Sequence, residues 1–122
     1  MDTSDQTMSV VRAYHSGWTT KQFSDATDLL SPSLIVEVPI NEYPTTESFA
    51  RAVASFGTMV NKVTVLAEFV EGDEAMLLYD MDVDGLGALR IAEHFTVAGG
   101  KITKIRQGHD TAPIRAAGFS QN

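Results

Sequence analysis

The spacing of apolar residues changes once along this chain, from a helical period to a strand period, and this change restricts the possible folds most. Met8, Val11, His15 and Trp18 recur at helical spacing near the N-terminus. Over residues 62–109 apolar and polar residues alternate instead, which is typical of strands with one buried face. Helices followed by a run of strands predict an α+β fold, in which helices cover one face of an antiparallel sheet.

Short local signals set the expected bounds of the first two helices. Thr3 and Gln6 have capping-box spacing, which predicts the start of the first helix. Thr19 and Gln22 repeat that spacing before a second, shorter helix. We expect this second helix to run to Ser31–Pro32, because the residue before a proline disfavours helix.

The later elements follow from turn residues and alternation. We expect a strand at 34–38, a loop at 39–46 and a third helix that ends near Gly57. Four strands follow, divided by turns at 71–74, 84–87 and 99–100, and a short helical or irregular tail covers 113–117. No repeat or linker divides the chain, so a single domain over residues 1–122 is expected.

The charge and composition exclude several classes of partner. Acidic residues outnumber basic ones 16 to 9, which gives a net charge of −7. Because an acidic surface repels phosphate groups, we expect neither nucleic acid nor an anionic membrane as a partner. The absence of cysteine excludes disulfides and thiolate metal ligands. The polar, acidic start and the lack of a long apolar run indicate a cytoplasmic location.

One segment has the appearance of a metal site. Asp80–Gly85 carries alternating carboxylates before a glycine, as in the first half of a calcium-binding EF-hand loop. Ile91 stands where that loop requires a glutamate, so we interpret the segment as the solvated face of a strand entering a turn. His15, His94 and His109 show no metal-ligand spacing. We therefore expect no metal and no cofactor.

Glu93 is the charged residue that interrupts the apolar face of the expected strand 89–97. Burial there raises the pKa of a carboxyl group and keeps it a proton donor nearer neutrality. Counting back from the hairpin at 99–100 instead places Arg106 opposite Glu93 as an ion-pair partner. A bulge that turns Ile105 inward fits the apolar face better. Glu93 is therefore either a functional acid or one half of a structural pair.

Three further residues are candidates for a site. Tyr14 and Trp18 lie one helical turn apart and are either core aromatics or residues whose polar ends point into a cavity. Asp110 follows the last strand and is either a turn-forming residue or a general base at a cavity mouth.

Five segments together resemble a known superfamily. They are Val10–Tyr14, Leu34–Pro39, Glu93–Phe95, Gly99–Ile102 and Asp110–Arg115. In this order they resemble the nuclear transport factor two-like superfamily, and within it the SnoaL-like polyketide cyclases and the ketosteroid isomerases. The resemblance spans nearly the whole chain. It implies a cone-like, curved, mostly antiparallel sheet wrapped around three helices from the N-terminal half, enclosing an apolar pocket.

The resemblance also implies roles for single residues. Tyr14 falls where the isomerases have a tyrosine that holds the substrate oxyanion, and Glu93 falls where they have a protonated acid. Val38 stands where the isomerases have their aspartate base, and valine cannot move a proton. Glu37 is adjacent but points to the opposite face of its strand. The cyclases use an aspartate late in the chain as acid/base, and Asp110 resembles it.

These features predict a small-molecule pocket protein, namely a cofactor-free acid/base enzyme of the isomerase, cyclase or hydratase type. Its substrate is expected to be an apolar carbonyl compound, and its catalytic residues Tyr14, Glu93 and Asp110. A true ketosteroid isomerase is not expected, because Val38 replaces the base. The alternative is a non-catalytic ligand-binding or accessory dimerisation domain. The expected ligand is a small apolar or aromatic molecule. The residues expected to line its pocket are Trp18, Val38, Phe56, Leu77, Tyr79, Met81, Ile91 and Ile105.

A homodimer is also expected. The resemblance implies one, and Met76 and Leu78 lie on the strand face turned away from the expected pocket. Apolar side chains on such a face give a second copy a surface to cover. We therefore predict a homodimer that forms through the outer face of the sheet.

Overall fold

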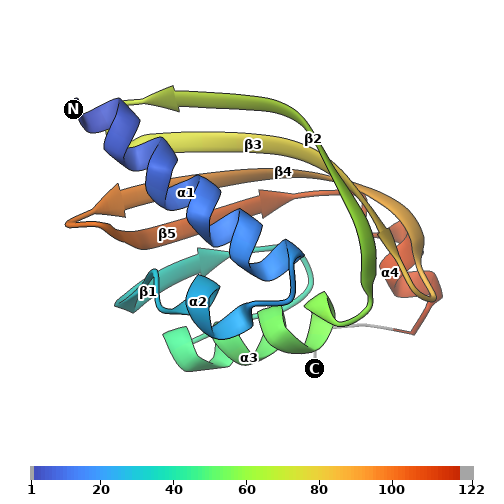
Figure 1. Ribbon diagram of the computed structural model, residues 1–122. Coiled ribbons are helices and arrows are strands. Elements are labelled where there is room, and N and C mark those ends of the chain that lie inside the picture. Colours follow the sequence, from blue (N-terminus) through green and yellow to red (C-terminus); the bar gives the residue numbers. More distant parts are fainter. Residues whose placement is uncertain (1, 119–122) are drawn as a thin grey trace.

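The computed structural model of the chain describes residues 2–118 and has an α+β fold, as predicted (Figure 1). Its helices are α1 (Thr3–Thr19), α2 (Phe23–Thr27), α3 (Thr46–Gly57) and α4 (Ala112–Ala116). Its strands are β1 (Leu30–Glu37), β2 (Val60–Glu71), β3 (Glu74–Val83), β4 (Gly87–Ala98) and β5 (Lys101–Gly108).

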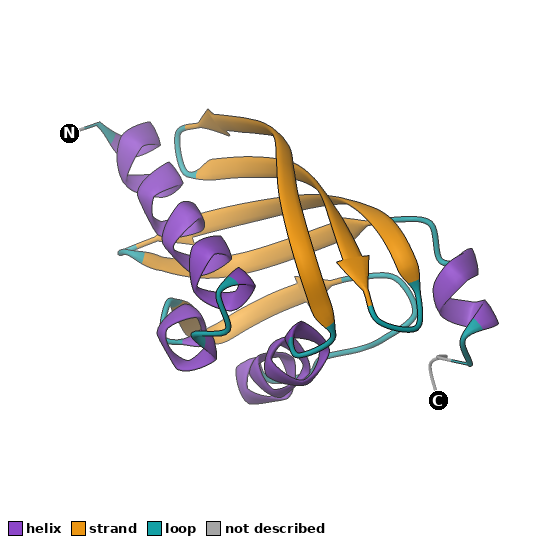
Figure 2. Cartoon of the chain, turned by 45° about the vertical axis from the view of Figure 1, so that its right-hand side comes forward, coloured by secondary structure: helices purple, strands orange, loops and turns teal. Residues whose placement is uncertain are grey.

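All five strands form one curved sheet in the order β1-β5-β4-β3-β2. Strands β2 to β5 pair antiparallel as consecutive hairpins, whereas β1 pairs parallel with β5. The strands bend around the helices, with α1 crossing the concave face and α4 at the far end of the sheet (Figure 2). The prediction of a curved, mostly antiparallel sheet wrapped around N-terminal helices is therefore confirmed.

The concave face of the sheet and α1 together build the core. Along β3 and β4 buried residues alternate with more exposed ones, because successive side chains of a strand point to opposite faces. Val11 and Tyr14 of α1 are fully buried against this face. The ring of Tyr14 meets that of Phe95 edge-on, with centroids 5.9 Å apart. The aromatic contact fixes α1 over the middle of the sheet.

The first helix begins differently from the expectation. Asp2 is the N-cap of α1, and its carboxylate accepts a hydrogen bond of 2.8 Å from the backbone nitrogen of Asp5. The prediction of a capping box that starts at Thr3 is therefore wrong, because the neighbouring aspartate is an equally good cap and takes the position. The second capping box is also absent, since Gln22 caps α2 without a side-chain hydrogen bond.

The second helix is shorter than expected, and the strand after it is longer. Helix α2 ends at Thr27, and β1 already includes Leu30, which pairs with Ile102 of β5. Sheet pairing thus overrides the helical spacing of the apolar residues before Pro32. The proline is tolerated because β1 is an edge strand of the sheet.

A bulge sets the register between β4 and β5. The pairing shifts by one residue at Thr103, which leaves this residue without a partner across the ladder. Ile105 consequently points inward and is fully buried, and Glu93 stands opposite Gln107. The bulge considered from the sequence is confirmed, and the placement of Arg106 opposite Glu93 is wrong.

The basic residue that the bulge displaces lies on the outer face. Arg106 donates a hydrogen bond of 2.7 Å from Nε to Oε1 of Glu37 on the neighbouring β1. Lys104 lies 3.4 Å from the same oxygen. Glu37 therefore points away from the concave face, as expected from strand alternation.

The segment Asp80–Gly85 is a strand that ends in a turn, in agreement with our interpretation. Asp80 accepts two hydrogen bonds from the guanidinium of Arg90, at 2.7 and 2.9 Å. Asp84 accepts one of 2.6 Å from Asn61. Among residues 2–118, no three histidine, aspartate or glutamate side chains are grouped so that they could hold a metal ion.

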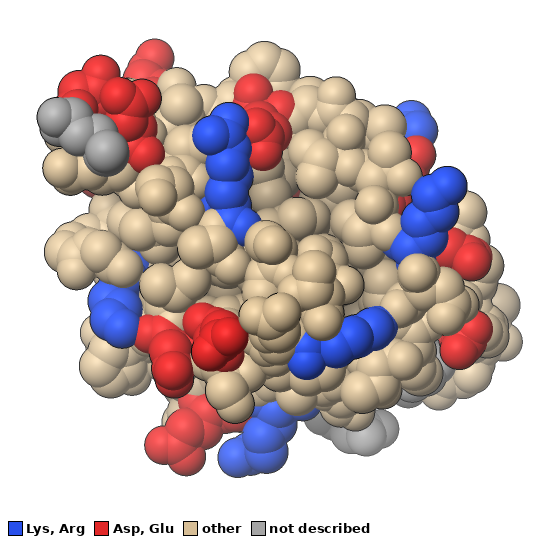
Figure 3. All heavy atoms as spheres, viewed as in Figure 1, with Lys and Arg blue, Asp and Glu red and all other residues tan. Residues whose placement is uncertain are grey.

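The surface charge is unevenly spread. Acidic side chains gather around the N-terminal end of α1, whereas lysine and arginine side chains are scattered over the same face of the molecule (Figure 3). A scattered distribution offers no continuous basic track on this face for a phosphate backbone. Within the described part of the chain, no helix combines the length and the apolarity that crossing a membrane requires.

Candidate functional site

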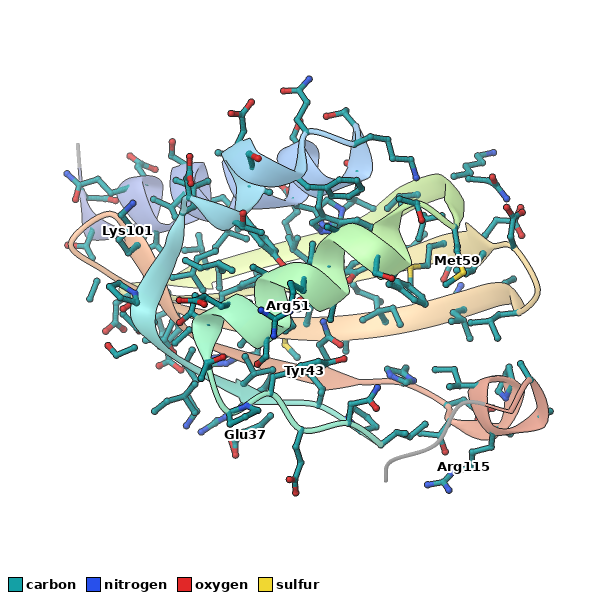
Figure 4. The ribbon with its side chains drawn as sticks, turned by 90° about the horizontal axis from the view of Figure 1, so that it is seen from below. Glu37, Tyr43, Arg51, Met59, Lys101 and Arg115 are labelled. Atoms are coloured by element: carbon teal, nitrogen blue, oxygen red, sulfur yellow. The ribbon has the colours of Figure 1, made fainter. Side chains whose placement is uncertain are left out.

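A cavity of about 170 Å³ opens between the concave face of the sheet, α3 and α4. Its walls come from α1, from the loop between β1 and α3, from α3 itself, and from β3, β4 and the end of β5. Seen from below, α3 crosses in front of the sheet and Tyr43 extends from the loop beside it (Figure 4). Most lining side chains are apolar, which is the usual character of a small-molecule site.

Most of the expected lining residues are in the wall. They are Trp18, Val38, Phe56, Tyr79, Met81 and Ile91, together with the candidate acids Tyr14 and Glu93. Leu77 and Ile105 are not in the wall, so their prediction is wrong. Both point inward, but they are fully buried beside Phe95 and Glu93 on the part of the sheet that α1 covers.

Glu93 places a carboxyl group in this apolar wall, where the residue is only 1% exposed. The hydroxyl of Tyr79 donates a hydrogen bond of 2.8 Å to Oε1, and Nε2 of Gln107 donates one of 2.8 Å to Oε2. Burial raises the pKa of the Glu93 carboxyl, and the two hydrogen bonds oppose this shift only in part. No lysine or arginine in the described chain forms an ion pair with Glu93. The site therefore shifts the carboxyl group toward its neutral, proton-donating form.

The two tyrosines beside Glu93 remain protonated. Burial, and next the negative charge of Glu93, raise the pKa of the Tyr14 and Tyr79 hydroxyls well above the ordinary value. The hydroxyl of Tyr79 already donates its hydrogen bond to Glu93. Between residues 2 and 118 no comparable bond occupies the hydroxyl of Tyr14. Tyr14 is therefore a hydroxyl donor in the wall that a ligand can use.

Asp110 does not reach the cavity. It is exposed, and its Oδ1 accepts a hydrogen bond of 3.0 Å from the backbone nitrogen of Ala112. This contact matches the alternative considered from the sequence, a turn-forming aspartate at the end of a strand. The expectation that Asp110 stands beside Tyr14 and Glu93 is wrong, because its exposed side chain lies outside the wall that His109 lines.

The neighbouring His109 lines the cavity instead. Its Nδ1 lies 3.1 Å from the backbone carbonyl oxygen of Asp110. Since a carbonyl oxygen can only accept, Nδ1 is the donor in this contact, and Nε2 is the ring nitrogen that remains for a ligand. His109 thus brings an imidazole into the same wall as Tyr14 and Glu93.

The loop between β1 and α3 enters the wall through a strained turn. Ile40 has a φ of +74°, and the backbone nitrogen of Asn41 donates a hydrogen bond of 2.8 Å to the carbonyl of Pro39. This is the three-residue γ-turn of the rare, strained kind. A β-branched residue at positive φ is an outlier that costs about 1–3 kcal/mol. The half-buried Ile40 lines the cavity with both of its neighbours.

Some lining residues were missed at the sequence level. Gln107 and His109 follow Ile105 at the strand period, so continuing the alternation past the bulge would have identified them. Ile40 and Tyr43 come from a loop, where no periodicity marks which side chains point inward.

The family model of the SnoaL-like domain matches residues 11–105, which is more than half of the chain. The chain belongs to the SnoaL-like family. The superfamily resemblance predicted from the sequence is therefore confirmed. A search of curated proteins finds no match to this sequence.

Solved structures confirm the fold of this SnoaL-like domain. A protein from Kribbella flavida DSM 17836 is 27% identical, with a TM-score of 0.81 over 89% of this chain and 90% of that one. An NTF2-like protein from Cytophaga hutchinsonii is 20% identical, with a TM-score of 0.80 over 89% and 94% of the two chains. An LEH-like epoxide hydrolase from M. tuberculosis is 15% identical, with a TM-score of 0.75 over 93% and 90%. At these identities the last two show the fold alone.

Proposed function

We propose that this SnoaL-like domain is a cofactor-independent acid/base enzyme of the isomerase, cyclase or hydratase type. Its substrate is a small, apolar or aromatic carbonyl compound. The observation that carries the proposal is the carboxyl group of Glu93, which is 1% exposed, lines an apolar cavity and is held by neutral donors alone. A buried acid of this kind, in a concave site, is a candidate for proton transfer.

The donors act on the oxygen of the substrate. A protonated Glu93 and Tyr14 donate hydrogen bonds to the carbonyl oxygen, and both bonds strengthen as negative charge develops there. Tyr79 and Gln107 are positioning residues, because they hold the Glu93 carboxyl group from either side. In a low-dielectric wall such preorganised donors stabilise an enolate more than water does.

The base is His109. Nε2 of its neutral ring removes a proton from the carbon beside the carbonyl, and the enolate forms against Glu93 and Tyr14. The imidazolium then returns the proton to another carbon or to a leaving oxygen, which balances the reaction without a redox partner. His109 takes the role for which Val38 is unsuited and for which Asp110 lies too far outside the wall.

The size of the cavity supports the proposed substrate class. A volume of about 170 Å³ is below the roughly 300–1,000 Å³ of sites for drug-sized ligands, which favours a compact substrate. The relative described as an LEH-like epoxide hydrolase is 15% identical and shares the fold alone. The fold hosts other activities too, so the residues of this site carry the proposal.

The test is deuterium exchange at the carbon beside the carbonyl of a compact ketone such as 2-tetralone, followed by NMR in deuterated buffer. Exchange needs only the base and the oxyanion donors, so it does not require the natural substrate. The wild type should accelerate exchange, and Glu93→Gln, Tyr14→Phe and His109→Gln should each reduce that acceleration by about 10²-fold or more. Asp110→Asn is the matched control and should retain it.

A non-catalytic ligand-binding domain is the second candidate, and the apolar Val38 at the isomerase base position favours it. In that case the ketone should bind saturably to the wild type while exchange stays at the buffer rate. Exchange that survives all three substitutions would refute the proposed roles.

A further inference from the structure

Two residues other than glycine have a positive φ in the described chain, namely Lys21 and Ile40. Glycine adopts such a backbone at no steric cost, whereas a residue with a side chain is strained there. A side chain at such a position is therefore a ground for a hypothesis about what it does there.

The use of Lys21 is visible in the structure. Its Nζ donates hydrogen bonds to the carbonyl oxygens of Gly57 and Val60, at the end of α3 and the start of β2. A glycine at position 21 would relax the backbone but lose both contacts. The side chain of Lys21 thus compensates for the strain by joining two elements.

Ile40 has no such bond to make, because its side chain is a hydrocarbon. It is half-buried and lines the cavity, as its neighbours Pro39 and Asn41 also do. It lies in the γ-turn that leads from β1 to the loop. The turn fixes the direction of the Cβ atom, and β-branching leaves few rotamers to the side chain. The strained backbone therefore holds one rigid aliphatic group at a defined place in the wall.

We propose that Ile40 is a specificity-determining residue of this site, and that its strained turn holds the side chain where it limits the size of the ligand. This inference rests on the proposed ligand site. A rigid branched group at the wall admits a flat, compact ring system and excludes a larger one. Relief of the backbone strain should therefore change the stability of the protein. Loss of the branched side chain should change its ligand preference, so the two effects can be measured separately.

The strain is tested by comparing glycine with alanine at two positions of the same loop. At an ordinary loop residue such as the exposed Glu42, the glycine variant should melt at a lower temperature than the alanine variant, because glycine loses more entropy on folding. At position 40 the order should reverse, with Ile40→Gly melting several degrees above Ile40→Ala. The same order at both positions would show that residue 40 stores no strain and would overturn the proposal.

The specificity is tested with three phenols of increasing size, phenol, 1-naphthol and 9-phenanthrol, by calorimetric titration. The wild type should prefer the smaller two, and Ile40→Ala and Ile40→Gly should shift the affinity ratio toward the largest by roughly tenfold. Ile40→Val keeps a branched group and should keep the wild-type ratio. Binding with an unchanged ratio in the alanine and glycine variants would overturn the specificity role alone. Failure of the wild type to bind any of the three would overturn the ligand site and this inference with it.

Discussion

Gln107 donates a hydrogen bond of 2.8 Å from Nε2 to Oε2 of Glu93, in the register that the bulge at Thr103 imposes on β5. Without that bulge a guanidinium would stand opposite the carboxyl group. An opposite charge at such a distance lowers the pKa of a carboxyl group, whereas a neutral amide leaves the effect of burial dominant. One extra residue in a strand thus decides between a structural ion pair and a buried acid.

Glu93 should make folding stability fall as the pH rises. Its pKa in the folded protein is raised above 4.5 by burial, so the folded state holds the proton more tightly than the unfolded chain does. The stabilisation is complete below the unfolded value and is lost as the pH rises through the raised folded value. Urea unfolding of wild type and Glu93→Gln from pH 4 to 9 should show the variant gaining relative stability with pH.

The control for this comparison is another glutamate. Glu37 is exposed, and hydrogen bonds from Arg106 and Lys104 lower its pKa. Glu37→Gln should therefore show no gain at high pH. Parallel stability curves for wild type and Glu93→Gln would mean that Glu93 has the same pKa folded and unfolded, and would contradict the neutral acid.

His15 should make the protein sensitive to acid. Its ring lies between Trp18 and Tyr79, at centroid distances of 5.3 and 4.7 Å, and neither ring nitrogen has a hydrogen-bond partner among the described residues. Burial lowers its pKa from 6.5 to about 4, and the charge of Glu68 opposes the shift. The folded state binds this proton less tightly, so stability is lost as the pH falls from 6.5 toward 4, by about 3 kcal/mol at most.

Two substitutions separate the charge of His15 from its unpaired polar atoms. His15→Leu should remove this loss in acid and also stabilise the protein near neutral pH, because it removes buried groups that lack partners. His15→Gln should remove the loss in acid without the gain at neutral pH. Acid unfolding followed by circular dichroism measures both, and an unchanged acid transition in His15→Leu would assign the sensitivity to other residues.

The approach of α1 to α2 should not tolerate a methyl group. A Cβ atom added at Gly17 would lie 2.9 Å from Cβ of Ala26 and 3.1 Å from its backbone. Gly17→Ala should destabilise the protein by about 1–3 kcal/mol, as overpacking of a core does. Gly108→Ala is the matched control, because a Cβ there has no heavy atom within 4 Å. Equal thermal unfolding of the two variants would show that α2 can move aside.

The sequence predicted those parts of this molecule that periodicity controls. Strand alternation placed Glu93 inward and Glu37 outward, and it favoured a bulge that turns Ile105 inward. Strand alternation also assigned Leu77 and Ile105 to the cavity, because alternation alone does not show which inward-pointing residues α1 covers. A strand pattern gives the face of a residue, and only the packed helix decides whether that face is core or cavity.

The misplacement of Asp110 has a different physical cause. Asp110 and His109 are adjacent, and a shift of one residue at the end of a strand exchanges the inner and outer faces. The resemblance to the cyclases implies an aspartate late in the chain, so it pointed to Asp110 and not to the adjacent imidazole of His109. Ile40 could not be found at all, because a γ-turn inside a loop has no periodic signal.

The outer face of the sheet carries apolar side chains that the described chain leaves uncovered. Phe69 of β2 and Met76 of β3 are paired across the ladder and are 66% and 41% exposed. Leu78 lies on the same face, two residues along β3 from Met76. We propose that a second copy of the chain covers this patch, because an isologous contact between two such faces buries both at once.

A lysine at the centre of the patch should prevent this association. Met76→Lys places a charge where an apolar surface is to be buried, so the variant should run as a monomer at concentrations at which the wild type is a dimer in analytical ultracentrifugation. Ile35→Lys is the control. Ile35 is also exposed, at 57%, but β1 lies three strands from β3, roughly 14 Å away across the sheet. It should leave the dimer intact. A wild type that is monomeric at every concentration, or a Met76→Lys variant that still dimerises, would contradict an interface at this patch.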